Sequence, residues 1–210
     1  MAKLLYMGRN SFRIIGAKGT VIYVDPYAGD DYDIPADLIL VTHQHSDHNA
    51  IKKVAKKSEC LIIQNYEALE GGVHNNFDYK GIYVQSVEAN NKNHPRTECV
   101  GFIVTLEGID MYFAGDTNET EEMKTFPEKH LEYAFLPCDG YYNMDYKEAA
   151  HCAEIIGAQN NVPVHSSPHK DYSLKNALAF ASVAPNCPRP QAVPAGTHHS
   201  APGEPDCVAE

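Results

Sequence analysis

Four potential metal ligands lie within one short stretch of this chain, at His43, His45, Asp47 and His48. Residues i and i+2 of an α-helix point about 200° apart, so His43 and His45 cannot share one face of a helix. Their side chains can converge only from a tight loop, and the apolar run at residues 38–41 places that loop at the end of a buried strand. Three imidazoles and a carboxylate brought together in this way suit a borderline divalent metal ion.

The alternative interpretation of this stretch is a polar loop in which Asp47 is the N-cap of a following helix. Capping would account for one of the four residues and would leave the three histidines unexplained. The spacing therefore favours a metal site.

Three further candidate ligands stand where predicted strands or turns end. Asp116 follows an apolar run that closes with Gly115, where the backbone can turn. His165 follows a short apolar strand, and His94 lies in an Asn-rich loop just before Pro95. Loops at one edge of a sheet can meet at one place. Such a set would suit two metal ions, with three histidines on one ion, mixed nitrogen and oxygen ligands on the other, and a carboxylate between them.

Short runs rich in Ile, Val, Tyr and Phe, separated by turns that contain glycine, predict the strands that position these ligands. The predicted strands cover residues 3–7, 11–15, 20–25, 38–42, 60–64, 81–87, 99–106, 109–114, 132–136 and 161–164. A helix is predicted just after the ligand loop, because Ile51, Val54 and Ala55 have helical spacing. The alternation of strands with helices indicates an α/β protein whose sheets are covered by helices.

The helix predicted at residues 145–156 has the clearest signals in the chain. Asp145 and Glu148 form a capping-box pattern at its start, and Gly157 stands just after its end. Two predicted hairpins also resemble one another loosely, since each ends in an aspartate, Asp25 in one and Asp116 in the other. This likeness is weak evidence for an internal duplication.

Charge and composition limit the classes of function. The formal net charge is −11 and no basic stripe is present, so we expect no nucleic-acid partner. No apolar run approaches the ~20 residues needed to span a bilayer, and no secretory signal is recognisable, so we expect no membrane partner. The six cysteines are scattered without a CxxC pair, which indicates reduced thiols and a cytoplasmic protein.

The length of 210 residues suits one sizeable domain. We expect that domain to cover residues 1–185. Residues 186–210 are rich in proline and aperiodic, and we expect them to form a poorly ordered C-terminal tail. The sequence leaves the oligomeric state open.

Taken together, these motifs resemble the metallo-β-lactamase fold superfamily. The resemblance rests on the Thr-His-Gln-His-Ser-Asp-His run, the later lone histidine, Ala-Gly-Asp-Thr at residues 114–117 and Val-Pro-Val-His at residues 162–165. Within the superfamily the chain is most similar to the L-ascorbate-6-phosphate-lactonase-like metal-dependent hydrolases, over roughly residues 3–170. The resemblance implies a four-layer αββα sandwich in which two mixed β-sheets are flanked by helices.

The resemblance also implies a ligand set of seven residues and two divalent metal ions. His43, His45 and His94 would bind the first ion, Asp47, His48 and His165 the second, and Asp116 would bridge them. Zn²⁺ is the first expectation, and Mn²⁺ or Fe²⁺ would also suit such a site.

Two positions near this set leave questions open. His74 is the alternative to His94 as the third ligand of the first ion. Members of the family often carry a histidine after the glycine of the first strand, where this chain has Arg9 and Asn10. That departure concerns the contacts of the substrate rather than the metal site.

The function that follows is a dinuclear metal-dependent hydrolase of a small ester, lactone or phosphoester. A metal-bridging hydroxide would be the nucleophile, and Asp47 and Asp116 are the expected catalytic residues. The alternative is a metal-binding regulatory or scaffold protein that retains the site without turnover. Residues that could lie near a small substrate are Arg9, Cys138, Tyr141, Tyr142, His169 and Lys170.

Overall fold

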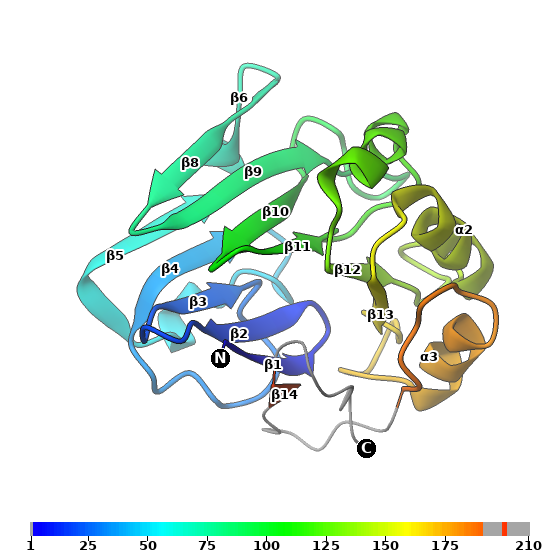
Figure 1. Ribbon diagram of the computed structural model, residues 1–210, viewed down its shortest axis with the longest axis horizontal. Helices are drawn as coiled ribbons and strands as arrows, with labels where there is room; N and C mark the ends of the chain where they lie inside the picture. Colours follow the sequence, from blue (N-terminus) through cyan, green and yellow to red (C-terminus); the bar gives the residue numbers. More distant parts are fainter. Residues whose placement is uncertain (1, 191–198, 201–210) are drawn as a thin grey trace.

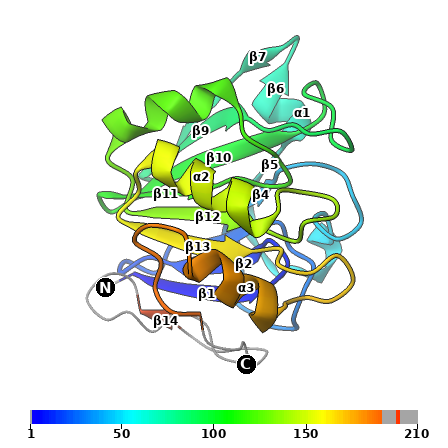
Figure 2. The ribbon, with the colours of Figure 1, turned by 90° about the vertical axis from the view of Figure 1, so that its right-hand side faces the viewer.

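Two six-stranded sheets pack face to face, and helices lie against the outer face of the second (Figures 1 and 2). The computed structural model describes residues 2–190 and 199–200. In the first sheet the order is β14-β1-β2-β3-β4-β5. Its strands are β1 (Lys3–Gly8), β2 (Ser11–Ile15), β3 (Val21–Val24), β4 (Ala36–Val41), β5 (Lys56–Gln64) and β14 (His199–Ser200). Strands β1, β2 and β3 pair antiparallel, whereas β3, β4 and β5 pair parallel.

The second sheet has the order β13-β12-β11-β10-β9-β8. Its strands are β8 (Asn76–Tyr79), β9 (Ile82–Glu88), β10 (Val100–Leu106), β11 (Ile109–Phe113), β12 (Tyr133–Pro137) and β13 (Asn160–Val164). Strands β8 to β11 pair antiparallel, and β11, β12 and β13 pair parallel. Between β5 and β8 the chain forms α1 (Asn65–Ala68) and a ribbon of β6 (Leu69–Glu70) and β7 (Val73–His74).

The main core lies between the inner faces of the two sheets. Alternate residues of each strand point inward, as the period of two along a strand requires. Phe12 of the first sheet lies 5.0 Å from Phe113 and 4.7 Å from Phe135 of the second, measured between ring centroids. These aromatic contacts join the two sheets next to the ends of the strands that carry the candidate ligands.

Helices cover the outer face of the second sheet. They are η2 (Glu121–Lys129), α2 (Tyr146–Ile156) and α3 (Leu174–Ala181), and Figure 2 shows α2 and α3 side by side in front of this layer. Met123, Phe126 and Ala153 are fully buried against the sheet. The predicted helix at residues 145–156 is confirmed, with Asp145 accepting hydrogen bonds from the backbone N–H groups of Lys147 and Glu148.

The helix predicted at residues 51–55 is wrong. The chain forms only a three-residue 3₁₀ turn, η1 (Ile51–Lys53), and Val54 is already extended. Strand β5 must begin at Lys56, opposite Ala36 of β4, so strand pairing leaves no room for a helix. The loop around Tyr32 shields the outer face of this sheet instead.

The capping-box prediction is only half right, because the Glu148 carboxylate accepts hydrogen bonds from Asn118 rather than returning to Asp145. Gly157, with a φ of 68°, ends the helix as expected. Most of the predicted C-terminal tail, residues 191–198 and 201–210, lies outside the described residues. Within the described part of the chain, no helix is long and apolar enough to cross a membrane.

Candidate metal centre

The ligand loop begins where β4 ends, and its first residue is fixed by Asp25. One oxygen of the Asp25 carboxylate accepts from the Thr42 backbone N–H at 2.8 Å, and the other accepts from the Thr42 hydroxyl at 2.7 Å. The loop then turns tightly, with the His48 N–H donating to the carbonyl of His45 at 3.1 Å. Residues 46–48 form a turn and not a helix, so the interpretation of Asp47 as a helix N-cap does not hold.

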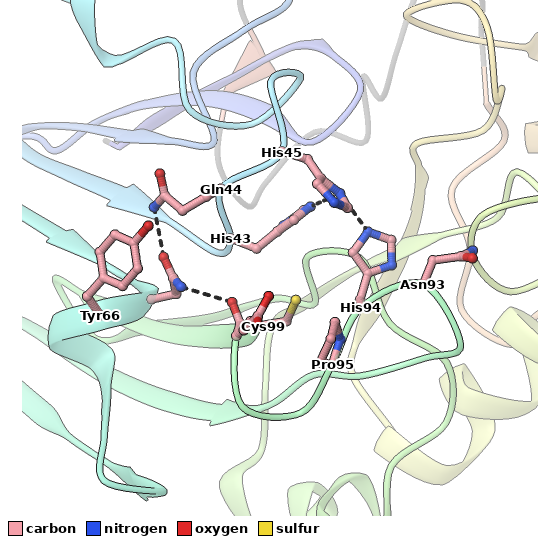
Figure 3. A pocket seen from close by; sticks show the side chains of 10 residues that line it. His43, Gln44, His45, Tyr66, Asn93, His94, Pro95 and Cys99 are labelled. Carbon is pink, nitrogen blue, oxygen red and sulfur yellow. Dashed lines mark hydrogen bonds between the residues drawn. The ribbon is translucent and has the colours of Figure 1, made fainter.

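His43, His45 and His94 form the first cluster, and Figure 3 shows their rings turned toward one another. Nδ1 of His45 lies 3.1 Å from Nε2 of His43 and 3.1 Å from Nε2 of His94. Nitrogen ligands about 2.05 Å from a tetrahedral Zn²⁺ lie about 3.3 Å apart, so the spacing fits a shared ion. His74 lies elsewhere, with Nδ1 3.3 Å from the Ser86 hydroxyl, and does not join this cluster.

Asp47, His48 and His165 form the second cluster. The Asp47 carboxylate oxygens lie 3.9 Å from Nε2 of His48 and 3.7 Å from Nε2 of His165. The two imidazoles are buried and stacked with centroids 5.7 Å apart. Nitrogen and oxygen ligands are mixed here, as in many sites for divalent ions.

Asp116 lies between the two clusters. Its Oδ1 is 3.4 Å from Nε2 of His48, while its Oδ2 is 3.4 Å from Nε2 of His94 and 3.6 Å from Nε2 of His165. The structure thus brings all seven candidate ligands of the sequence analysis to one place.

Gly115 allows Asp116 to reach this position. Its φ is +66°, and a Cβ at this residue would lie 2.9 Å from Cβ of Thr42, at the start of the ligand loop. Only glycine permits both the backbone angle and the close approach of β11 to the ligand loop.

Each buried histidine of the site is held from behind through Nδ1. For His48 the hydrogen-bond partner is Asp25 at 2.8 Å, and for His165 the Asp139 carboxylate lies at ion-pair distance, 3.2 Å. For His94 the partner is Asn91 at 2.8 Å, and for His43 it is the Thr42 hydroxyl at 3.1 Å. Such outer contacts fix the ring and leave Nε2 directed at the centre, as is usual for histidines that bind metals.

The motifs of the sequence did not predict Asp25, Asn91 or Asp139 as part of the site. Asp25 carried a usable signal, because it ends a strand and its hairpin resembles the one that leads to Asp116. Asn91 and Asp139 lie in loops that contain several polar residues, and nothing in their spacing sets them apart.

Arg9 and Asn10 hold the two carboxylates of the site. The Asn10 side-chain amide donates to Oδ1 of Asp116 at 2.8 Å, and Nη1 of Arg9 lies 3.6 Å from Oδ2 of Asp47. Arg9 also donates to the carbonyl of Ser167 at 3.1 Å and is almost fully buried. Its guanidinium is therefore engaged within the protein rather than turned toward a substrate anion.

The electrostatics of the two clusters differ. Burial lowers the pKa of His43 well below its usual value, and the neighbouring imidazoles add to this effect, so its ring is neutral and its lone pair available. Burial also lowers the pKa of His165, but Asp116, Asp139 and Asp47 outweigh it and raise the pKa to about 10. The same ion pairs overcome burial and lower the pKa of Asp47 and Asp116.

A cation fits the second cluster. Nε2 of His48 and Nε2 of His165 are buried without a hydrogen-bond partner among the described residues, and both face ionised carboxylates. A buried polar atom without a partner is costly, and a divalent ion would supply the missing one for both.

The remaining residues that the sequence brought forward lie around the site or away from it. Cys138 is fully buried, whereas Tyr141 and Tyr142 are exposed. His169 is exposed too, and its ring lies 6.1 Å from that of Tyr141. His130 and His151 are exposed surface residues.

Comparison with known proteins agrees with this geometry. Residues 3–165 match the family described as the Beta-lactamase superfamily domain. A UPF0173 metal-dependent hydrolase of Thermococcus onnurineus is 29% identical over 192 residues, which cover 79% of this chain and 84% of that protein.

Solved structures agree as well. One from Parabacteroides distasonis, described as a candidate metal-dependent hydrolase, is 28% identical, with a TM-score of 0.70 over 89% of this chain and 92% of that one. A metallo hydrolase of Ignicoccus hospitalis has a TM-score of 0.70 at 20% identity, covers 94% of this chain and 97% of its own, and supports the fold alone. The resemblance and the fold expected from the sequence are therefore confirmed.

Proposed function

The chain belongs to the beta-lactamase superfamily and is a metal-dependent hydrolase, and we propose that it uses two divalent metal ions on a small ester, lactone or phosphoester. The observation that carries the proposal is the position of Asp116. Its two carboxylate oxygens face imidazole nitrogens from both clusters. A carboxylate in that position is suited to link two cations.

In this proposal His43, His45 and His94 hold one ion, Asp47, His48 and His165 hold the other, and Asp116 is shared. The mixture of imidazole and carboxylate favours Zn²⁺, and Mn²⁺ or Fe²⁺ would also be accepted. When bound, such ions lower the pKa of water to ~7 and polarise a carbonyl or phosphoryl oxygen.

The side chains of the protein would position the reactants. Asp47 is the more accessible of the two carboxylates, with 28% of its side chain exposed against 4% for Asp116. Because its pKa is lowered, Asp47 is ionised at neutral pH and can accept a hydrogen bond from the attacking water. Arg9, 3.6 Å away, keeps the carboxylate directed at the site.

A thiol nucleophile is not needed for this reaction. Cys99 is buried beside the first cluster, and burial together with the charge of Asp116 raises its pKa to about 12. A protonated thiol is a poor nucleophile.

The test is elemental analysis of the purified protein, followed by a screen of lactones, thioesters and phosphodiesters with and without a chelator. We expect close to two metal ions per chain, turnover that is lost with chelator and restored by Zn²⁺ or Mn²⁺, and a rate that rises through pH ~7. His45→Ala should empty the first cluster, whereas His151→Ala, at an exposed histidine of α2, is the matched control.

Each result distinguishes a different alternative. Full activity with one ion per chain would exclude the dinuclear mechanism. Stoichiometric metal with no turnover of any substrate class would favour a metal-binding regulatory or scaffold protein.

A further inference from the structure

A hollow of about 300 Å³ opens beside the first cluster (Figure 3). Its lining consists of His43, Gln44, His45, Asn65, Tyr66, Asn93, His94, Pro95, Glu98 and Cys99. Because the three histidines of the cluster form one wall, a substrate whose reacting bond lies at the cluster extends into this hollow.

The only charged side chain in the described lining of the hollow, apart from the histidines, is acidic. Among the described residues that form the hollow, none is a lysine or an arginine, and Glu98 is the one carboxylate. Glu98 is exposed, and within the described chain its carboxylate has no hydrogen-bond or ion-pair partner. An anionic group placed here, on the side away from the metal ions, would meet a like charge, and the described side chains of the lining offer no lysine or arginine to offset it.

The side-chain amides of the lining are already engaged in hydrogen bonds. The Gln44 amide donates to Asn65 Oδ1 at 2.7 Å, and the Asn65 amide donates to the carbonyl of Glu98 at 2.9 Å. The Asn93 amide donates to the carbonyl of Tyr142 at 3.1 Å. The charged group that the hollow offers a ligand is the carboxylate of Glu98, which only accepts hydrogen bonds, and the Tyr66 hydroxyl is a neutral donor or acceptor beside it.

Tyr66 adds an aromatic surface at the hollow. Its side chain is 60% exposed and lies on the side away from the histidine wall (Figure 3). An aromatic face beside a carboxylate acceptor suits a chain or ring that carries C–H groups on one side and hydroxyl donors on another.

We propose that this hollow binds the uncharged, hydroxyl-bearing part of the substrate, and that Glu98 selects this part over an anionic one. The inference rests on the proposed hydrolase function and narrows its substrate class. If the natural substrate carries a phosphate, that group belongs at the metal ions and not in the hollow.

The experiment compares three probes with the metal-loaded protein: D-glucono-1,5-lactone, its 6-phosphate and 4-nitrophenyl acetate. The first two differ by one anionic group, and the third is small enough to report the reaction without filling the hollow. The variants are Glu98→Gln and Glu98→Lys, with Glu128→Lys, at an exposed site on η2, as the control for the change in net charge.

For the wild type we expect kcat/KM to favour the neutral lactone over its phosphate. Glu98→Lys should shift this ratio toward the phosphate by about tenfold, the effect of reversing one charge in a partly hydrated site. Glu98→Gln should shift it less, mainly through KM, while Glu128→Lys should leave it unchanged.

A wild type that prefers the phosphorylated lactone, or a ratio that Glu98→Lys does not move, would overturn the inference. If 4-nitrophenyl acetate is still hydrolysed in that case, only the inference fails. If none of the three probes is hydrolysed, the ester and lactone part of the proposed function fails with the inference.

Discussion

The two sheets share one pattern of strand pairing but supply the site in different ways. Strands β1 to β5 and strands β9 to β13 each form two antiparallel pairs followed by two parallel pairs. In each sheet the third of these strands is followed by a buried aspartate, Asp25 in the first and Asp116 in the second. The loose likeness of the two hairpins in the sequence thus corresponds to a likeness in topology.

The aspartates nevertheless have different roles. Asp25 lies behind the ring of His48 and contacts its Nδ1, whereas Asp116 lies in front and faces Nε2. After the fourth strand of each set the roles of the two sheets are exchanged. In the first sheet β4 is followed by candidate ligands that face the centre, whereas in the second sheet β12 is followed by Asp139, which lies behind the ring of His165. Topology therefore brings a carboxylate to the site after each of these four strands, and only some of the carboxylates face the centre.

The largest effect is expected when the charge of Asp116, the aspartate that faces the centre, is removed. Asp116→Asn should lower kcat/KM by more than ~100-fold and release at least one metal ion, because a shared carboxylate serves both clusters. The measurement is elemental analysis together with hydrolysis of the best small substrate. Retention of both ions and full activity would show that Asp116 is not shared.

Gly115 tests why Asp116 can face the centre. Gly115→Ala should destabilise the protein by about 2–4 kcal/mol, since it adds a Cβ clash with Thr42 to the strain of a positive φ. Gly157→Ala is the control, because Gly157 has a φ of +68° but nothing within 4 Å of the added Cβ, and it should cost only about 1 kcal/mol. Urea unfolding of both variants measures the difference, and equal losses would contradict a close approach at Gly115.

The outer carboxylates should have intermediate and similar effects. Asp25→Asn and Asp139→Asn should each weaken metal binding by about 10–100-fold, because each removes the charge that orients one histidine. Titration of the metal-free variants with Zn²⁺ gives the two affinities. Losses as large as that of Asp116→Asn would mean that the distinction between facing and supporting carboxylates is false.

The smallest effect is expected for two acidic residues near the starts of β4 and β12, at the ends of these strands that lie away from the site. Asp37 of β4 accepts from the backbone N–H of Val21 at 2.9 Å, and Glu132, just before β12, accepts from that of Asp110 at 2.8 Å. Asp37 differs in having a lysine partner, Lys57, at 2.6 Å. Burial raises the pKa of Asp37, but the hydrogen bonds from Lys57 and Val21 outweigh it, so that the pKa is lowered.

Because the pKa of Asp37 is lower in the folded than in the unfolded protein, its ionised form stabilises the fold at pH values above about 3.9, the pKa of an unfolded aspartate. This stabilisation is lost as the pH falls through the pKa of Asp37 in the folded protein. Asp37→Asn should therefore cost up to about 1 kcal/mol at pH 7, limited by the solvent exposure of Lys57. The cost should shrink below about pH 4, as measured by urea unfolding at several pH values. Glu132→Gln is the control and should change stability by no more than ~0.5 kcal/mol at pH 7. A cost for Asp37→Asn that stays constant down to pH 3 would contradict the ion pair.

Six of the candidate ligands could be predicted from the sequence because they are polar residues in the loops that follow apolar strands, whereas His94, in an Asn-rich loop, was supported mainly by the family resemblance. The structure brings these seven together, including His94 rather than His74. Their assignment to two ions is still a prediction. The supports Asn91 and Asp139 could not be identified, since a residue that contacts the back of a ring has no spacing rule of its own. Asp25 was missed although the likeness of its hairpin to that of Asp116 pointed to it. The helix expected at residues 51–55 failed because the pairing of β4 with β5 overrides a local periodicity.

The contact between Arg9 and the loop after His165 has a consequence for the order in which the molecule assembles. Arg9 and Ser167 are 158 positions apart in the chain, and the carbonyl of Arg9 also accepts from the backbone N–H of His165 at 2.9 Å. During synthesis on the ribosome, the three histidines of the first cluster emerge by residue 94, whereas the second cluster lacks a member until residue 165 has left the exit tunnel. All three histidines of the first cluster are therefore synthesised well before the second cluster can be complete, because the second cluster needs the loop that follows β13 and its contacts with Arg9.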